Sequence, residues 1–371
     1  MRILYFSTAY STHDHRFLSA IAGAGHEVYY LRLEPVGRQI EDRPVPPQVH
    51  QVQWAGGRTP FRWIDAPRLA WDLRRVLREI KPDVVHAGPI QTCAFLAALT
   101  GFHPLLTMSW GFDLMQDVNR SRWWQEVTRF TLRRSTFFTS DAQVTRDMAV
   151  AYGMDPDRTV VFPWGVDLEH FRIKKWHAGA RHFVLFCNRS WEPRYGVDVL
   201  ARAFVKVAAA RPNVGLILLG GGSQGQAIRQ IFMSADILDR VYFGGQVAQA
   251  ELPRWYHEAD LYISPSHVDG SSVSLMEALA CGLPALVSDI PANKEWVTDG
   301  QNGWLFRDGD ADELSRRILD ALARPELLPM VGLSARGVAE ARADWKKNAA
   351  VLLQTYDRIL ELEHIRRSSG D

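Results

Sequence analysis

The chain has 371 residues, of which 47% are hydrophobic and 23% charged, and these proportions are typical of a globular protein with two α/β domains. The formal net charge of +1 excludes a dedicated nucleic-acid-binding protein, although residues 1–175 carry a net +4 and the remainder a net −3. Cys93, Cys187 and Cys281 stand far apart in apolar runs, which indicates reduced core thiols of a cytoplasmic protein and no cysteine metal site.

Strand and helix patterns alternate along the first half of the chain, which is typical of parallel α/β architecture. Strands are predicted at residues 2–6, 26–33, 83–86 and 105–109, and helices at residues 15–24, 69–80 and 92–99. Gly25 is expected to end the first of these helices, and Lys81-Pro82 the second.

A second series of the same kind follows. Strands are predicted at residues 182–187, 215–219, 241–243, 261–264 and 285–288, with helices at 198–210 and 252–258. The polar segment 163–181 is interpreted as a linker, so that residues 1–170 and 181–344 form two Rossmann-like domains with a ligand cleft between them. Residues 345–371 contain a last helix, at 345–365, which is expected to pack back on the first domain.

Two acids, Asp269 and Glu277, lie eight positions apart around a turn that opens an apolar helix. The free N–H groups of Ser271, Ser272 and Val273 suit a diphosphate, because the start of a helix favours an anion. Carboxylates accept hydrogen bonds strongly and suit sugar hydroxyls. The alternative is that Asp269 caps the helix and Glu277 is an ordinary exposed residue.

Six stretches in this order and spacing resemble the retaining glycosyltransferases of family 4, over nearly the whole chain. They are Gly25-His26-Glu27-Val28, Lys81-Pro82-Asp83-Val84-Val85-His86, Phe162-Pro163-Trp164-Gly165-Val166-Asp167, residues 188–198 (Asn188 to Asp198), residues 269–277 and Asn302-Gly303-Trp304-Leu305-Phe306. The resemblance implies the α/β GT-B fold, which has two facing Rossmann-like domains and a C-terminal crossover helix.

The resemblance also implies roles for residues that contact a nucleotide-sugar donor. Arg189 stands where the family binds the donor diphosphate, and a cation there neutralises the departing charge. The family's usual lysine is replaced by Tyr195, and the neighbouring Arg194 is expected to supply the second charge; the alternative is a solvated arginine. Glu277 matches the acid that holds the donor ribose, and Asp269 the acid near the transferred sugar.

The remaining donor-site positions are mostly backbone. Val247 aligns with a position whose backbone reads the base, although a plain valine at the end of a strand is an equal alternative. The turn that ends at Gly222, together with Gly270, lets the backbone approach the nucleotide, but such turns are also common as simple connections.

The first domain departs from the family in two loops. Residues 7–16 replace a Gly-rich loop; Thr12 is a candidate helix cap, and His13, Asp14 and Arg16 are interpreted either as facing acceptor or phosphate or as local capping and solvated groups. Where the family often has a histidine the chain has Trp110, which is expected to stack on a sugar, with Asp113 binding an acceptor hydroxyl in the catalytic set.

No apolar run reaches the roughly 18 residues that span a bilayer, and residues 1–6 are a strand without the long apolar part of a signal peptide. Residues 120–134 are basic and aromatic at helical spacing, and residues 58–63 have the same character. Such a stripe suits the inner face of an anionic membrane. The alternative is a helix whose apolar side faces the core and whose basic side is solvated.

The prediction is therefore a retaining, metal-independent hexosyltransferase of polysaccharide or cell-envelope biosynthesis. It takes a UDP- or GDP-sugar as co-substrate, needs no cofactor and transfers to a glycan, lipid-linked or small-molecule acceptor. Two alternatives stay open: a GT-B sugar-nucleotide epimerase or phosphorylase, and a non-catalytic subunit that binds a sugar nucleotide. Product analysis with donor alone, or with phosphate as acceptor, separates these from transfer.

Overall fold

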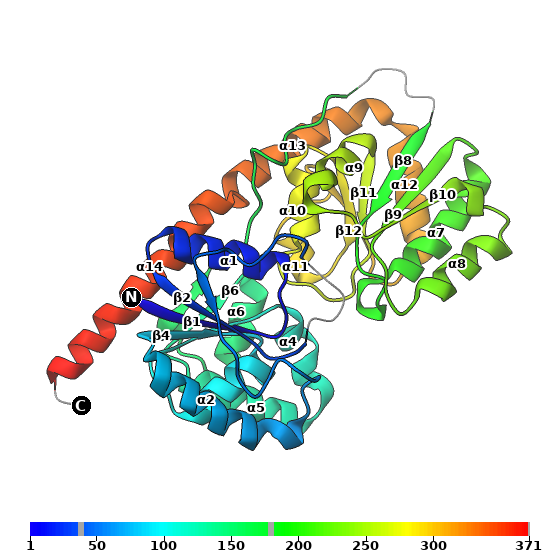
Figure 1. Ribbon diagram of the computed structural model, residues 1–371. Helices are drawn as coiled ribbons and strands as arrows, with labels where there is room; N and C mark the ends of the chain where they lie inside the picture. The colour runs from blue at the N-terminus through cyan, green and yellow to red at the C-terminus, as the bar shows by residue number, and fades with distance from the viewer. Residues whose placement is uncertain (36–40, 177–181, 370–371) are drawn as a thin grey trace. The chain divides into compact units, whose positions relative to one another are not determined.

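The computed structural model describes residues 1–35, 41–176 and 182–369. The chain divides into two compact units, each with its own sheet (Figure 1): unit 1 is Met1–Pro163 with Lys346–Asp371, and unit 2 is Trp164–Trp345. The first crossing falls at the start of the segment expected as a linker, of which residues 177–181 lie outside the described residues. The second crossing falls one residue into the last helix.

Unit 1 contains a seven-stranded sheet in the order β3-β2-β1-β4-β5-β6-β7, and every pairing is parallel. Its strands are short apolar runs because both faces are covered by helices. They are β1 (Arg2–Ser7), β2 (Glu27–Arg32), β3 (Val49–Gln51), β4 (Val84–Ala87), β5 (Leu105–Met108), β6 (Phe137–Ser140) and β7 (Thr159–Val161).

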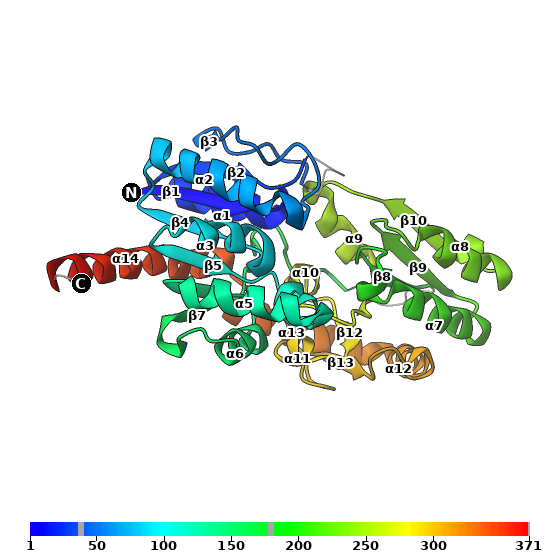
Figure 2. The ribbon, with the colours of Figure 1, turned by 90° about the horizontal axis from the view of Figure 1, so that it is seen from below.

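The helices of unit 1 cover both faces of this sheet. The α2, α3 and α5 helices share one hydrophobic core with β1, β2, β4 and β5 (Figure 2). On the other face, a 2.7 Å hydrogen bond joins the hydroxyl of the buried Tyr356, from α14, to Nδ1 of His86 in β4. The elements are α1 (Thr12–Gly23), η1 (Trp63–Asp65), α2 (Ala66–Ile80), η2 (Ile90–Ala94), α3 (Phe95–Thr100), α4 (Phe112–Met115), η3 (Asp117–Arg120), α5 (Arg122–Arg134), α6 (Gln143–Ala151), η4 (Pro156–Arg158) and α14 (Trp345–Ser369).

Unit 2 repeats the architecture with six parallel strands in the order β10-β9-β8-β11-β12-β13. Chain order reverses between β8 and β11, so the loops after these neighbouring strands leave toward opposite faces of the sheet. Ligands of such sheets bind at this point. The strands are β8 (Phe183–Cys187), β9 (Val214–Leu219), β10 (Val241–Gly245), β11 (Leu261–Ser264), β12 (Ala285–Ser288) and β13 (Gly303–Phe306).

Helices cover both faces of the second sheet as well. The α7, α8 and α12 helices pack on one face, and α9, α10 and α13 on the other. The elements are η5 (Pro193–Tyr195), α7 (Val197–Ala210), α8 (Gly225–Ser234), η6 (Leu238–Arg240), η7 (Gln249–Glu251), α9 (Leu252–Glu258), α10 (Val273–Ala280), α11 (Pro291–Lys294), α12 (Ala311–Ala323), η8 (Pro325–Leu327) and α13 (Leu328–Arg342).

The predicted strands and helices are present within a few residues of their expected bounds, and the predicted α/β fold class is confirmed. Lys81 ends α2 in the left-handed conformation (φ 51°), directly before the proline that cannot continue a helix. The expected cap of α1 is wrong by one residue, because the Ser11 side chain, not that of Thr12, accepts the Asp14 N–H. Among the described residues, no helix is long and apolar enough to cross a membrane.

Candidate active site

The candidate site lies at the carboxyl ends of β8 and β11, which pair side by side in the sheet of unit 2. The loop after β11 runs into α10, whose N-cap is Ser272: its hydroxyl accepts the Leu275 N–H at 3.4 Å. Val273 is the first helical residue, so its N–H has no partner within the helix. Ser271 lies beneath the turn, where its hydroxyl accepts a bond from Trp296 Nε1 at 3.0 Å.

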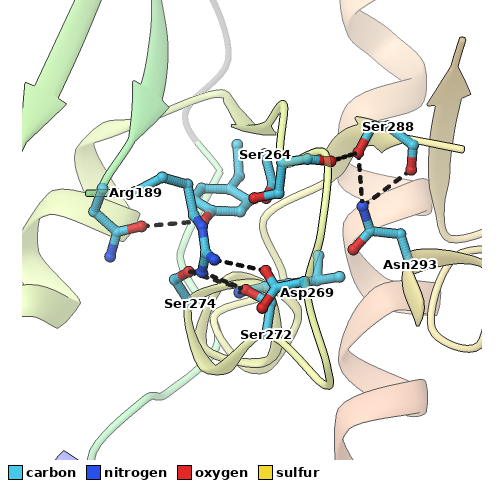
Figure 3. Close-up of polar contacts among 11 residues, drawn as sticks. Arg189, Ser264, Asp269, Ser272, Ser274, Ser288 and Asn293 are labelled. Carbon is cyan, nitrogen blue, oxygen red and sulfur yellow. Dashed lines mark hydrogen bonds and ion pairs between the residues drawn. The ribbon is translucent and has the colours of Figure 1, made fainter. Parts of the chain in front are cut away.

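The guanidinium of Arg189, from the loop after β8, lies directly on the first turn of α10 (Figure 3). Its Nη1 donates to Ser272 Oγ at 2.8 Å and to Ser274 Oγ at 2.9 Å, and its Nη2 donates to Asp269 Oδ2 at 2.6 Å. The Tyr195 ring lies against the guanidinium, 4.4 Å away. The cation, the helix start and one predicted acid therefore form a single cluster.

Asp269 does not cap the helix, so the simpler interpretation of this acid is wrong. Its side chain is 15% exposed and that of Arg189 is 11% exposed, which makes this a nearly buried ion pair. Burial raises the pKa of Asp269 above its ordinary value, although the charge of Arg189 and hydrogen bonds from Gly270 and Ser272 oppose the shift. Because breaking such a pair leaves a buried charge, Asp269 fixes the orientation of Arg189.

Glu277 is not an ordinary exposed residue either, since it is 3% exposed. The Tyr256 hydroxyl donates to its Oε2 at 2.8 Å, and Gln249 Nε2 donates to its Oε1 at 3.2 Å. Tyr256 also accepts a 2.9 Å bond from Asn188 Nδ2, in the loop that carries Arg189. A polar network that begins at Asn188, the neighbour of Arg189 in the chain, thus holds Glu277 in place.

The glycine turn after β9 packs directly on the Arg189 loop. A Cβ on Gly222 would lie 2.5 Å from Trp191 O, so only glycine fits there. Glu192 fixes the turn by accepting the Ser223 N–H at 2.9 Å. The turn is therefore shaped to support the loop; its expected contact with nucleotide stays a prediction.

Two further predicted residues lie beside this site. Arg194 is half-buried, and its backbone oxygen accepts the His267 N–H at 2.9 Å, which ties the Arg189 loop to the Asp269 loop. Val247 is half-buried against the core that contains Tyr256. No contact of either residue decides between the expected role and the simpler alternative.

Asp113 was expected to bind an acceptor hydroxyl, and its place in the structure contradicts this. Its side chain is fully buried in unit 1. The carboxylate accepts the N–H groups of Ile90, Trp110 and Leu114 at 3.0–3.1 Å and the Ser109 hydroxyl at 2.6 Å. Oδ1 accepts the three bonds from its own loop and Oδ2 the one from Ile90 in η2, so Asp113 ties its loop to the start of η2.

Asp14, by contrast, accepts its hydrogen bonds from Ser11 through one oxygen, Oδ2. It is fully buried and accepts the backbone N–H and the hydroxyl of Ser11, as a capping residue does. The local-capping interpretation of this position is the correct one.

Four residues of the site were not predicted from the sequence: Asn188, Gln249, Tyr256 and Ser274. Ser274 could have been predicted, since it stands two positions after the N-cap, in the first turn of the helix. The other three come from separate loops and helices, and only the fold brings them to Glu277.

Comparison with known protein families assigns both units. Residues 11–170 match the model described as "Glycosyltransferase Family 4", and residues 170–352 match that described as "Glycosyl transferases group 1". Among solved structures, a sucrose-phosphate synthase of Thermosynechococcus elongatus superposes with a TM-score of 0.80 at 18% identity, covering 98% of this chain and 100% of that one. The HepE protein of Anabaena, solved with UDP-glucose, gives a TM-score of 0.77 at 18% identity, covering 97% and 100%.

Curated relatives align at lower coverage. A GDP-mannose-dependent alpha-(1-6)-phosphatidylinositol monomannoside mannosyltransferase of Mycolicibacterium smegmatis is 26% identical over 78% of this chain and 80% of that enzyme. A D-inositol 3-phosphate glycosyltransferase of Thermobispora bispora is 29% identical over 59% of this chain, and the match spans about half (55%) of that relative.

Together the two family models take in residues 11–352, and both sheets have the expected topology. The chain therefore belongs to glycosyltransferase family 4 and has the GT-B fold. It is a nucleotide-sugar-dependent hexosyltransferase by class.

Proposed function

We propose that the cluster around Arg189 binds the diphosphate of the donor and stabilises its charge as it leaves the sugar. The observation that supports this most directly is that the guanidinium rests on Ser272 and Ser274, in the first turn of α10. An anion placed there meets a fixed positive charge and the positive end of a helix dipole. Such preorganised groups favour the charge that develops on a leaving group.

The two acids take different parts in this proposal. Glu277, oriented by Tyr256 and Gln249, accepts hydrogen bonds from the ribose hydroxyls of the donor. Asp269 Oδ2 accepts the hydrogen bond that holds Arg189. The same carboxylate accepts a hydrogen bond from a hydroxyl of the transferred sugar. The acceptor then attacks the transferred sugar from the same face as that from which the diphosphate departs. The departing phosphate takes the acceptor's proton. We expect this chemistry to proceed without a metal, so activity should persist in a chelator.

The relatives favour particular substrates. Two of them are named for GDP-mannose or for inositol-phosphate acceptors, and a structural neighbour was solved with UDP-glucose. We propose a UDP- or GDP-hexose as donor and a phosphoinositol, free or lipid-linked, as the first acceptor to test, within cell-envelope biosynthesis.

A donor screen followed by product analysis tests the proposal. Thermal unfolding of the protein is measured with UDP-, GDP- and ADP-sugars, because a ligand at one hundred times its Kd adds about 2.7 kcal/mol to the free energy of unfolding. The best donor is then incubated with phosphoinositol, with phosphate and alone. A glycosylated inositol supports transfer, whereas sugar 1-phosphate or an epimerised donor supports the alternatives and contradicts the proposal.

We further propose that unit 1 contacts an anionic membrane through the starts of α2 and α5. Ile64 (81% exposed), Trp71 (65%) and Trp123 (58%) present large apolar side chains. The Trp63 ring lies 6.0 Å from that of Trp123, which joins the two helix starts. Residues 58–80 and 117–134 contain eleven arginines and only five acids, so this region has a net charge of +6, against +1 for the whole chain.

Vesicle sedimentation tests the membrane contact. The protein should bind vesicles that contain phosphatidylglycerol and should leave them as salt increases, because salt screens surface charge. Trp123→Ser should weaken binding several-fold, while Met233→Ser, an equally exposed apolar residue of unit 2, should not. Equal binding to pure phosphatidylcholine would contradict an electrostatic contact.

A further inference from the structure

A hollow of about 550 Å³ lies in unit 1 between α2 and the segment that follows β3. Its wall includes three arginines and one acid; the lining residues are Gln53, Trp54, Ala55, Arg58, Thr59, Arg68, Asp72 and Arg75. Because the segment leaves the carboxyl end of β3, the hollow stands at the ligand-binding edge of this sheet. None of these residues takes part in the donor cluster of unit 2.

The turn that carries Arg58 is rigidly built. Gly57 has a φ of +77°, and its N–H donates to Leu33 O at 2.7 Å. A Cβ on Gly56 would fall 2.3 Å from the Trp54 ring, so the turn can fold over the indole only with glycine there. The indole in turn donates to Arg32 O at 2.8 Å. Arg58 is therefore presented from a fixed backbone.

The acid of the hollow is already neutralised. Asp72 accepts from Arg75 Nε at 2.8 Å and from the Ala55 N–H at 2.7 Å. The hydrogen bond and charge of Arg75 hold the pKa of Asp72 below its ordinary value, so this carboxylate stays ionised and paired. Arg75 also donates to Glu79 Oε1 at 2.9 Å, so its charge is already shared between two carboxylates and is not left over for a ligand.

Two cations remain. Arg68 is 57% exposed, and among the described residues its ion pair is a long contact of 3.9 Å with Asp65. Arg58 is exposed and forms no ion pair with any residue in the described part of the chain. A second, smaller hollow of about 70 Å³ adjoins the first and is lined by Arg58, Arg32, Tyr30 and Gln51, among others. Arg58 therefore stands between a cationic hollow and one with several hydrogen-bonding groups.

We propose that Arg58 and Arg68 bind a phosphate group on a polyhydroxylated acceptor. Two arginine forks suit a phosphate dianion, because each can donate two parallel hydrogen bonds to its oxygens. The smaller hollow, with its phenol, amide and guanidinium groups, suits neighbouring hydroxyls. The proposal rests on the proposed function and specifies its acceptor: a phosphorylated polyol, either free or as a lipid headgroup.

Binding measurements on the full-length protein test this subsite. D-inositol 3-phosphate and unphosphorylated inositol are titrated calorimetrically into the wild type, Arg58→Gln and Arg68→Gln. Arg211→Gln serves as the control, because it removes an exposed arginine of unit 2 that lies outside the hollow, the donor cluster and residues 58–80 and 117–134. We expect each hollow variant to weaken phosphate-ester binding about tenfold, the control to be unchanged and inositol to bind far more weakly than its phosphate.

A lipid arm separates the two sources of phosphate. Vesicles of phosphatidylcholine, with and without phosphatidylinositol, are sedimented with the same proteins. Loss of binding in Arg58→Gln and Arg68→Gln in the lipid arm alone identifies a headgroup, and loss in the soluble arm identifies a free phosphate ester; either supports the subsite. Unchanged binding in both arms, or no binding by the wild type in either, overturns it.

The donor arm keeps this result separate from the proposed function. Thermal shifts with the donor nucleotide should be identical in all four proteins, because the hollow is not part of the donor cluster. If the donor shift is absent while Arg58-dependent phosphate binding persists, the proposed function fails and the subsite stands. If transfer proceeds and the KM for a phosphorylated acceptor is the same in every variant, the subsite fails and the proposed function stands.

Discussion

Two buried aspartates, Asp113 in unit 1 and Asp269 in unit 2, both follow the carboxyl end of a parallel strand, and they do opposite things. Asp113 accepts three backbone N–H groups and one hydroxyl from its own surroundings. Asp269 bonds an arginine that comes from a different loop. The first carboxylate ties its own loop to the start of η2 through N–H groups, and the second joins two loops around a charge.

The contrast teaches that the partner, and not the position, decides what a buried acid does. A carboxylate surrounded by N–H donors is saturated and has nothing left for a ligand. A carboxylate paired with a guanidinium creates an oriented cation whose remaining N–H groups can face an anion. The predictions below test whether the two acids differ in this way.

The largest expected effect is that of Arg189→Ala. Loss of the cation should lower turnover by about two to three powers of ten, some 3–4 kcal/mol, with a much smaller change in donor affinity, because the developing charge on the leaving group is greater than that of the bound donor. Steady-state kinetics with Arg202→Ala as a surface control measures this. Full turnover in Arg189→Ala would remove the cluster from the mechanism.

Asp113→Ala should instead reduce stability. It leaves three backbone N–H groups without their acceptor in a buried loop, which should cost about 3 kcal/mol of unfolding free energy. Urea denaturation measures the loss, and Asp320→Ala, at an exposed position, should change it little. If Asp113→Ala keeps its stability but loses turnover, the original expectation of an acceptor contact returns.

Glu277→Gln should raise the donor KM about tenfold, or about 1.4 kcal/mol, with turnover nearly unchanged. A neutral amide accepts hydrogen bonds less strongly than a carboxylate, while its size still fits beside Tyr256. Glu258→Gln, an exposed acid on α9, is the control. An unaltered donor KM would exclude Glu277 from the ribose contact.

The smallest effect is a dependence of stability on pH. Burial raises the pKa of Asp113 to about 6, so between pH 4 and 6 the folded protein holds a proton that the unfolded chain has lost. The stability from this proton is present at low pH and is lost as pH rises through 6. From pH 5 to pH 7 the loss should be about 1 kcal/mol, and Asp113→Asn should lack it. An equal slope in both proteins would show that Asp113 does not titrate there.

Much of the fold could be predicted because each strand is a short apolar run between turn residues. Four strands were missed. β3 (Val-His-Gln) and β7 (Thr-Val-Val) have too few residues for a recognisable pattern, and their partners in the sheet define them. The four-residue strands β6 and β13 were also not predicted. The helix at Ala311–Ala323 was missed although Asp310 caps it, accepting the N–H groups of Asp312 and Glu313.

The candidate site divides in the same way. The sequence by itself placed Asp269 and Glu277 on one strand–turn–helix unit, where ligands bind at the carboxyl end of the strand. The family resemblance, and not residue spacing, added Arg189 to them. Only the tertiary structure decided which acids were free to act. Whether a carboxylate faces a cation or its own backbone depends on how loops from distant parts of the chain fold against it, and residue spacing does not contain that information.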